Sequence, residues 1–273
     1  DLHLSIRRQR QMCIRDSEYP LYTSTLAIKA YSHPTAHDFL VARDGWVKYV
    51  KERQLTEKLG WKPEDKQFGG WGYCRVIPKK LEPNVIGPAN IESNLSATVF
   101  ALDALRTAGE LDADTAFAAE KFLHRCQNDD GGFHFIYDDP TRNKAGMSST
   151  EPHVFNSYGS TTADGVRALN ITEPIVEAAG KAPIRFGNPT PWVKSWQWLQ
   201  KHFTAETHPG TYVEKHEPNR EAVYYYYAAS VAKAFRDVKL SLPDDRDWAD
   251  ELGRELVRRQ KPDGSWVNAV DLV

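Results

Sequence analysis

The sequence predicts an all-α fold made of repeated helix pairs. Segments with apolar residues at helical spacing, and with Lys, Arg or Glu between them, alternate with segments rich in Ala, Ser and Thr. A Gln, a Gly-containing turn and an aromatic residue follow most of the charged segments. Alternating runs of β-branched residues, which would indicate strands, are absent.

The charged segments are predicted to be outer helices, because each has one apolar face. The helix-ending Gln recurs in three of the four, and Phe203 replaces it in the third. The predicted outer helices are Phe39–Gln54, Ala116–Gln127, Trp192–Phe203 and Trp248–Gln260. The turns that follow them contain Gly69-Gly70-Trp71 (after a polar insertion, 55–68), Gly131-Gly132-Phe133, His208-Pro209-Gly210 and Gly264-Ser265-Trp266.

The segments rich in small residues are predicted to be inner helices, because small side chains let helices pack closely on both sides. They align on the tripeptides Lys29-Ala30-Tyr31, Asp103-Ala104-Leu105, Arg167-Ala168-Leu169 and Lys233-Ala234-Phe235. Their predicted bounds are Tyr22–Tyr31, Asn94–Ala108, Ser160–Asn170 and Tyr224–Val238, with N-capping expected from Ser24, Ser96, Ser160 and Ser230. An open solenoid and a closed double ring of helices would both bury such an inner series.

The Gln-turn-aromatic unit is interpreted as structural, since it recurs at equivalent places. A Gln side chain can bond to backbone groups left without partners at a helix end, and the aromatic ring can cover its amide. The glycines permit positive φ in the turn. Gln54, Gln127, Gln260 and Trp266 are therefore assigned to the repeat, and Asp129, Asp130 and Asp263 to the turns.

Composition excludes several classes of partner. Of the 273 residues, 41% are hydrophobic and 26% charged, and the net charge is −2, which favours neither nucleic acid nor an anionic membrane surface. No apolar run is long enough for a transmembrane segment. The three Cys are widely spaced and indicate neither a disulfide framework nor a zinc site. We expect a soluble protein, whose compartment and oligomeric state the sequence does not assign.

The first seventeen residues, Asp1–Ser17, are interpreted as foreign to the protein. They are Arg-rich, lack helical periodicity and have no apolar centre that a signal peptide would need. Met12–Ser17 can be reverse-translated as ATG TGT ATA AGA GAC AG, which resembles a transposon end used in sequencing libraries. We therefore expect a native domain over 18–273 from a fragmentary, metagenomic-type assembly, and a repeat array cut at both ends.

Two segments, Lys121–Phe133 and Arg254–Trp266, resemble the QW motif of triterpene cyclases. Protein prenyltransferase β subunits share a related Gly-Gly-Phe turn. The stretches Asn156–Thr162 and Tyr224–Ala228 are most similar to bacterial prenyltransferase/squalene oxidase repeat proteins. The resemblance covers 18–273 and implies a squalene-cyclase-like α/α toroid, here incomplete at both ends with an exposed apolar edge, and a hydrophobic isoprenoid-type ligand.

The catalytic signatures of these families are missing. Squalene-hopene-type cyclases carry an Asp-x-Asp-Asp acid motif, whereas the equivalent positions here are Asn94–Ala97 and Tyr158–Thr161. Asp244–Asp247 is expected to cap a helix. The positions equivalent to the prenyltransferase zinc ligands, Ser160–Thr162 and Tyr227-Ala228, hold no Asp, Cys or His. Terpene cyclase or prenyltransferase catalysis is therefore not assigned, and neither a metal nor another cofactor is expected.

The candidate site lies at the starts of the inner helices, beside the Gly-aromatic turns and the long loop before Tyr158. The catalytic candidates are Asp164, Glu151 and His153. The residues expected to line an apolar, π-rich pocket for an isoprenoid or lipid are Trp71, Tyr73, Phe133, His134, Tyr137, Tyr158, Tyr224 and Tyr226. The simpler interpretation is a buried hydrogen bond or cap for Asp164, solvated loop positions for the two His, and core packing for the aromatics.

Two other functions stay open. One is a non-catalytic module that binds a protein or peptide on an exposed apolar rim. The other is a glycan-acting helical barrel that uses carboxylates such as Asp139, Glu151 and Asp164, which would need two of them to face each other across ~5–9.5 Å. A deep aromatic-walled pocket would favour the lipid hypothesis, and a filled or shallow centre would oppose it.

Overall fold

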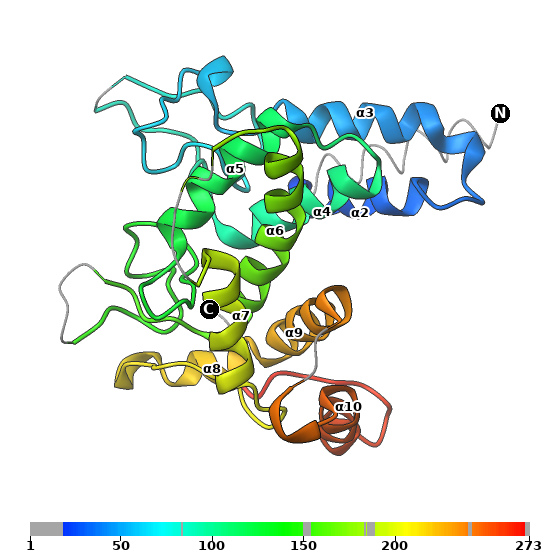
Figure 1. The fold of residues 1–273 in the computed structure, drawn as a ribbon, viewed down its shortest axis with the longest axis vertical. Helices are drawn as coiled ribbons and strands as arrows, with labels where there is room; N and C mark the ends of the chain where they lie inside the picture. The colour runs from blue at the N-terminus through cyan, green and yellow to red at the C-terminus, as the bar shows by residue number, and fades with distance from the viewer. Residues whose placement is uncertain are drawn as a thin grey trace. The chain divides into compact units, whose positions relative to one another are not determined.

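The computed structural model describes residues 19–82, 84–149, 154–182, 184, 189–239 and 242–270. Within these ranges the regular structure is helical, and extended residues pair only at isolated positions, which confirms the all-α class (Figure 1). The α-helices are α2 (Pro20–Tyr31), α3 (Leu40–Lys51), α4 (Leu95–Thr107), α5 (Ala113–Cys126), α6 (Gly159–Ala178), α7 (Pro191–His202), α8 (Pro218–Ala222), α9 (Tyr224–Val238) and α10 (Trp248–Arg259). Short 3-10 turns lie at His37–Phe39, Glu57–Leu59, Glu214–His216 and Pro243–Asp245.

The chain divides into two compact units. Unit 1 comprises residues 1–122 and 171–182, and unit 2 comprises 123–170 and 183–273. The boundary falls inside α5 and α6, so each of these helices contributes to both units. Unit 1 contains α2, α3 and α4, and unit 2 contains α7, α8, α9 and α10.

The predicted alternation of outer and inner helices is present in the structure. The outer helices α3, α5, α7 and α10 and the inner helices α2, α4 and α9 begin and end within three residues of their predicted bounds. Helix α6 is longer than predicted, because it continues from Asn170 to Ala178 through Pro174. Ile171 and Val176 are buried, so apolar contact favours this extension despite the proline. The short helix α8 was not predicted.

The expected serine N-caps are wrong. Helix α4 is capped by Asn94, whose Oδ1 accepts from the Ala97 N–H at 2.9 Å. Ser24 instead donates to the Pro20 carbonyl inside α2, and Ser230 lies within α9. Small hydroxyl side chains also suit the interior of closely packed helices, so their presence did not locate the helix starts. The expected Asp cap is confirmed, because Asp247 accepts from two N–H groups at the start of α10.

The first Gln-turn-aromatic unit ties α3 to the next outer helix. Gln54 Nε2 donates at 2.9 Å to the Gly69 carbonyl in the turn and at 2.9 Å to the Thr115 carbonyl in the first turn of α5. The Trp71 indole donates to the Val50 carbonyl at the end of α3. The indole, and not the Gln amide, thus satisfies the helix-end carbonyl, which corrects the role expected for Gln54.

The second unit repeats this tie between α5 and α7. Gln127 Nε2 donates at 3.3 Å to the Gly131 carbonyl in its turn and at 2.8 Å to the Pro191 carbonyl in the first turn of α7. In each unit the backbone N–H of the aromatic residue then donates to a threonine of the following inner helix, Phe133 to Thr162 and Trp71 to Thr98, both at 3.1 Å. One unit therefore joins two outer helices and one inner helix.

The first glycine of each turn allows a close backbone approach. Gly69 has φ 93° and Gly131 has φ 89°. A Cβ at Gly69 would lie 1.8 Å from the Ala118 carbonyl oxygen of α5, and one at Gly131 would lie 2.5 Å from the Lys194 carbonyl oxygen of α7. Both the positive φ and the missing side chain are needed, because the turn rests directly on the next outer helix.

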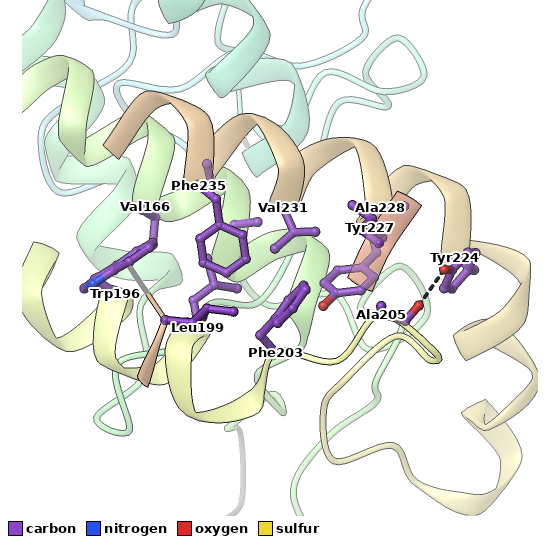
Figure 2. Close-up of a cluster of buried hydrophobic side chains, with 14 residues drawn as sticks. Val166, Trp196, Leu199, Phe203, Ala205, Tyr224, Tyr227, Ala228, Val231 and Phe235 are labelled. Atoms are coloured by element: carbon purple, nitrogen blue, oxygen red, sulfur yellow. Dashed lines mark hydrogen bonds between the residues drawn. The ribbon is translucent and has the colours of Figure 1, made fainter. Parts of the chain in front are cut away.

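The third unit, which lacks Gln, is filled by an aromatic core. Figure 2 shows Phe203 and Leu199 of the α7 region packed against Tyr227, Val231 and Phe235 of α9. The Phe203 and Phe235 rings meet edge to face at 5.0 Å. Apolar burial here replaces the hydrogen bonds that Gln supplies in the first two units, so the degenerate copy still packs.

Replacing Gln127 by Ala is expected to lower the free energy of unfolding by about 1–3 kcal/mol, because it removes two buried hydrogen bonds. Urea denaturation monitored by circular dichroism measures the change. The matched control is Gln260→Ala, at the same repeat position but exposed, for which we expect a change of about 0.5 kcal/mol or less. Equal losses in the two variants would contradict the role of the inter-helix tie.

Candidate functional site

A buried polar cluster joins α6 and α9 at the position of the main catalytic candidate. Asp164 is completely buried. Its Oδ1 accepts from Arg167 Nη1 at 3.2 Å, and its Oδ2 accepts from the Tyr226 hydroxyl at 2.6 Å. Ser230 also bonds to this carboxylate. Burial raises the pKa of Asp164 above its ordinary value, although Arg167 and Tyr226 act in the opposite direction.

The same cluster separates the Asp164 carboxylate from solvent. Arg167 is 3% exposed in its side chain and also lies 4.0 Å from Asp237. Tyr226 is half-buried, and its hydroxyl holds the Asp164 Oδ2. Tyr226 is therefore the partly exposed side chain of this cluster that bonds directly to Asp164. The structure thus brings together two of the predicted residues, Asp164 and Tyr226.

A second polar network surrounds the turn of the Gln127 unit. Asp130 Oδ1 accepts from the Gly132 N–H and from the Ser157 hydroxyl, both at 2.8 Å, which confirms its assignment to the turn. Asn128 donates to the Ser157 oxygen at 2.8 Å, and its Oδ1 lies 3.1 Å from His134 Nδ1. Burial lowers the pKa of His134 to about 4. His134 is therefore a buried neutral member of the scaffold and not a solvated loop residue.

Several aromatics expected to line a pocket are completely or almost completely buried. Trp71, Phe133 and Tyr224 are 0% exposed, and Tyr158 is 2% exposed. The Tyr224 hydroxyl donates to the Ala205 carbonyl at 2.6 Å (Figure 2). These side chains belong to the core. The half-buried members of the predicted set are Tyr73, Tyr137 and Tyr226.

Tyr73 belongs to an aromatic cluster in unit 1 that the sequence did not predict. We define it as Tyr19, Tyr22, Tyr73 and Phe100. The Tyr22 ring lies 4.7 Å from Phe100 and 5.1 Å from Tyr73, and Tyr19 meets Tyr73 edge to face at 5.3 Å. The hydroxyls of Tyr22 and Tyr73 are hydrogen-bonded to each other. Tyr19 is 41% exposed and the other three rings are half-buried, so the cluster has one face in solvent.

A repeat-based comparison would have located both sites. When the inner helices are aligned on Ala30, Ala104, Ala168 and Ala234, Tyr22 and Tyr226 occupy the same position. Phe100 and Asp164 likewise occupy one position. Each Tyr contacts the residue opposite it on the neighbouring inner helix, Tyr22 on Phe100 and Tyr226 on Asp164. The two sites thus use the same pair of repeat positions, but the Tyr comes from the earlier inner helix in one and from the later inner helix in the other.

His208 is a further buried residue that the sequence did not identify as important. Its Nε2 accepts from the Ser160 N–H at 2.8 Å, its Nδ1 lies 3.1 Å from the Tyr212 hydroxyl, and its ring stacks on Tyr227 at 4.8 Å. This fixes the neutral tautomer with the proton on Nδ1. Burial, with a smaller contribution from Arg220, lowers the pKa of His208 to about 3. His208 thus satisfies the start of α6 where the sequence predicted a serine cap.

Two surface grooves are large enough for small molecules. One, of about 360 Å³, lies in unit 1 and is lined by Lys48, Lys51, Lys58 and other mainly charged residues. The other, of about 430 Å³, lies in unit 2 and is lined by Arg246, Arg254, Arg258 and neighbouring residues. Both are open, and neither is lined by an aromatic side chain. They differ in kind from the apolar pocket that the sequence led us to expect.

The remaining predicted features need only brief description. Glu151 and His153 lie outside the described residues. Cys74 and Cys126 are buried thiols. Across the described ranges, three or more His, Cys, Asp or Glu side chains nowhere gather as a metal would require. The helices of the described ranges are too short or too polar to cross a bilayer.

Comparison with known proteins gives limited similarity. No family model matches the chain, and no curated protein is significantly similar to it. Among solved structures, a similar chain is the type II terpene cyclase MstE from Scytonema in its apo form. The two are 16% identical, with a TM-score of 0.33, over 92% of this chain and 70% of that chain.

The burial of His208 predicts a pH-dependent loss of stability. Its folded-state pKa lies below the ordinary 6.5, so between pH 6.5 and about 3 the unfolded chain binds a proton that the folded chain excludes. The free energy of unfolding should therefore fall with decreasing pH, by about 1.4 kcal/mol per pH unit from this residue. His208→Gln, whose amide oxygen can accept from Ser160, should remove that part of the slope.

Urea titrations at several pH values between these limits measure the slope. The control is His37→Gln, at an exposed position that leaves the Ser160–His208 contact intact, and it should keep the slope of the unmodified chain. An unchanged slope in His208→Gln would exclude His208 as the titrating group.

Proposed function

We propose that this helix-pair repeat domain binds a hydrophobic, isoprenoid-type ligand at the aromatic cluster of Tyr19, Tyr22, Tyr73 and Phe100. The observation that carries the proposal is the solvent-facing arrangement of four rings from α2, α4 and the Trp71 turn. The resemblance of the Gln-turn-aromatic units to the QW motif is consistent with it.

The chemistry of the cluster suits such a ligand. Aromatic rings bind methyl-branched, unsaturated chains through burial of apolar area and dispersion, at about 25 cal/mol for each Å² of apolar surface removed from water. The rings are mutually tilted or edge to face, so they present both faces and edges to a flexible chain. The paired hydroxyls of Tyr22 and Tyr73 add a polar end where a ligand alcohol can bind.

The two alternative functions have less support. Asp139, a candidate acid for glycan hydrolysis, is partly buried, which opposes ionisation, but hydrogen bonds from Arg142 and Thr141 outweigh this and lower its pKa to about 2. A carboxyl with that pKa is ionised near neutral pH and cannot act as a general acid. Protein or peptide binding would use exposed apolar side chains, such as Val257 and Val41, at 71% and 88% exposure.

We also propose Asp164 as the proton donor of any reaction that this domain catalyses. The raised pKa of Asp164 and its bond to the half-buried Tyr226 favour this role. Because both carboxylate oxygens are bound within the protein, the proton would pass through the Tyr226 hydroxyl. Tyr226→Phe would then abolish turnover while leaving the aromatic cluster of unit 1 unchanged.

The proposed site predicts measurable binding of farnesol. Tyr73→Leu should weaken binding by about tenfold or more, because it removes a ring from the centre of the cluster. Tyr73→Phe retains the ring and should bind nearly as well as the unmodified chain. Isothermal titration calorimetry measures the affinities, with dodecanol as an unbranched comparison.

The matched control is Tyr137→Leu, a half-buried tyrosine of unit 2 outside the cluster, which should leave farnesol affinity unchanged. The proposal fails if farnesol does not bind to the folded chain. It also fails if Tyr73→Leu binds as tightly as the unmodified chain while circular dichroism shows the same helix content.

A further inference from the structure

The last Gln-turn-aromatic unit carries the same internal bonds as the first unit but faces solvent. Gln260 Nε2 donates to the Gly264 carbonyl at 2.8 Å, as Gln54 does to Gly69. The Trp266 indole donates to the Leu256 carbonyl, as Trp71 does to Val50. Yet Trp266 is 45% exposed, whereas Trp71 is 0% exposed. The unit is therefore preformed.

Two contacts made by the earlier units are not made by this one within the described residues. The second Gln54 bond reaches Thr115 in the first turn of the next outer helix, and Gln260 has no equivalent bond. Gly69 rests on the Ala118 backbone, whereas a Cβ at Gly264 would meet only the Gln260 side chain, at 3.8 Å. The end of α10 and its turn therefore expose the surface that, in the first two units, contacts the next outer helix.

Helix α3 offers the complementary surface. In the repeat alignment, Ala42 and Gly45 correspond to Thr115 and Ala118, the residues of α5 that receive Gln54 and Gly69. Among the described residues, no Gln side chain donates to the Ala42 carbonyl, and nothing lies within 4 Å of a Cβ built at Gly45. A glycine inside an exposed helix costs about 1 kcal/mol relative to alanine. Close approach of another backbone at this point would account for a glycine at position 45.

The flanking side chains are also complementary. Lys51 of α3 forms ion pairs with Glu110 and Asp112, ahead of α5, at 3.1 and 3.8 Å. At the proposed contact, Val257 stands at the repeat position of Lys51, and Phe39 stands at that of Asp112. Val257 is 71% exposed and Phe39 is 39% exposed. The ion pair between Lys51 and Asp112 is thus replaced by two apolar residues, one on each of the two surfaces. Both partners change together, as expected if the two surfaces meet.

We propose that the face formed by Val257, Gln260, Gly264 and Trp266 binds the first turn of α3 in a second copy of this chain. In this head-to-tail contact Gln260 Nε2 donates to the Ala42 carbonyl, Gly264 lies against the backbone at Gly45, and Val257 packs on Phe39. The contact is heterologous, so it assembles copies into a ring or an open chain. It is independent of the ligand site proposed above.

The first test uses Gly45→Gln and sedimentation velocity over a wide concentration range. The unmodified chain should associate, and Gly45→Gln should weaken association by at least about tenfold because the new side chain blocks the backbone approach. The same change should not destabilise the fold, since Gln is a better helix former than Gly. Arg43→Gln, about 200° around the same helix, is the matched control and should associate normally.

The second test fixes the register and the identity of the partner. Val257→Cys and Phe39→Cys are made in separate chains, each also carrying Cys13→Ser, and the two are mixed under mild oxidation. A mixed disulfide between the two variants is the expected result. The proposal is overturned if the unmodified chain stays monomeric, if Gly45→Gln associates normally, or if the two mixed variants form no disulfide with each other.

Discussion

The fold depends on a carboxamide with two donor hydrogens placed where one outer helix ends and the next begins. Gln54 and Gln127 each use one hydrogen on their own turn and the other on the first turn of the following outer helix. A single side chain thus fixes both the shape of the turn and the position of the neighbouring helix. The bonds are buried, so losing one leaves carbonyl groups without this partner away from water.

The tie also explains the sequence around it. The first glycine of the turn lacks a side chain because the Gln bonds hold the turn directly against the backbone of the next outer helix. Where the aromatic residue is Trp, its indole N–H donates to a carbonyl at the end of the preceding outer helix. The Phe133 ring lacks that N–H and contributes burial, while the Phe133 backbone N–H still donates to Thr162. Phe203 lacks the amide altogether, and the aromatic core of α7 and α9 replaces the tie there. The motif therefore varies in those parts for which packing can substitute.

Helical periodicity predicted α7 and α9 well, because each has a consistently apolar face. It could not predict that α6 continues past Asn170, since that depends on the burial of Ile171 and Val176 in the folded chain. The site was predicted only in part for the same reason. Composition indicated abundant aromatics but not which of them are buried, so Trp71 and Tyr224 were grouped with Tyr73. Asp164 and Tyr226 were identified separately, and only the structure shows the bond between them.

A repeated scaffold leaves its inner-helix positions able to diverge, because the ties that hold it lie at the turns. The position of Phe100 in α4 is that of Asp164 in α6. Phe100 packs against a Tyr of the preceding inner helix, and Asp164 bonds to a Tyr of the following one. At this position the repeat thus carries either a ring of an aromatic cluster or a buried carboxylate held by Arg167. A buried charge is costly unless it is paired, and a carboxylate at this position therefore requires a nearby cation. Because Arg167 stands one turn further along the same helix, the helix that carries the acid also supplies its counter-charge.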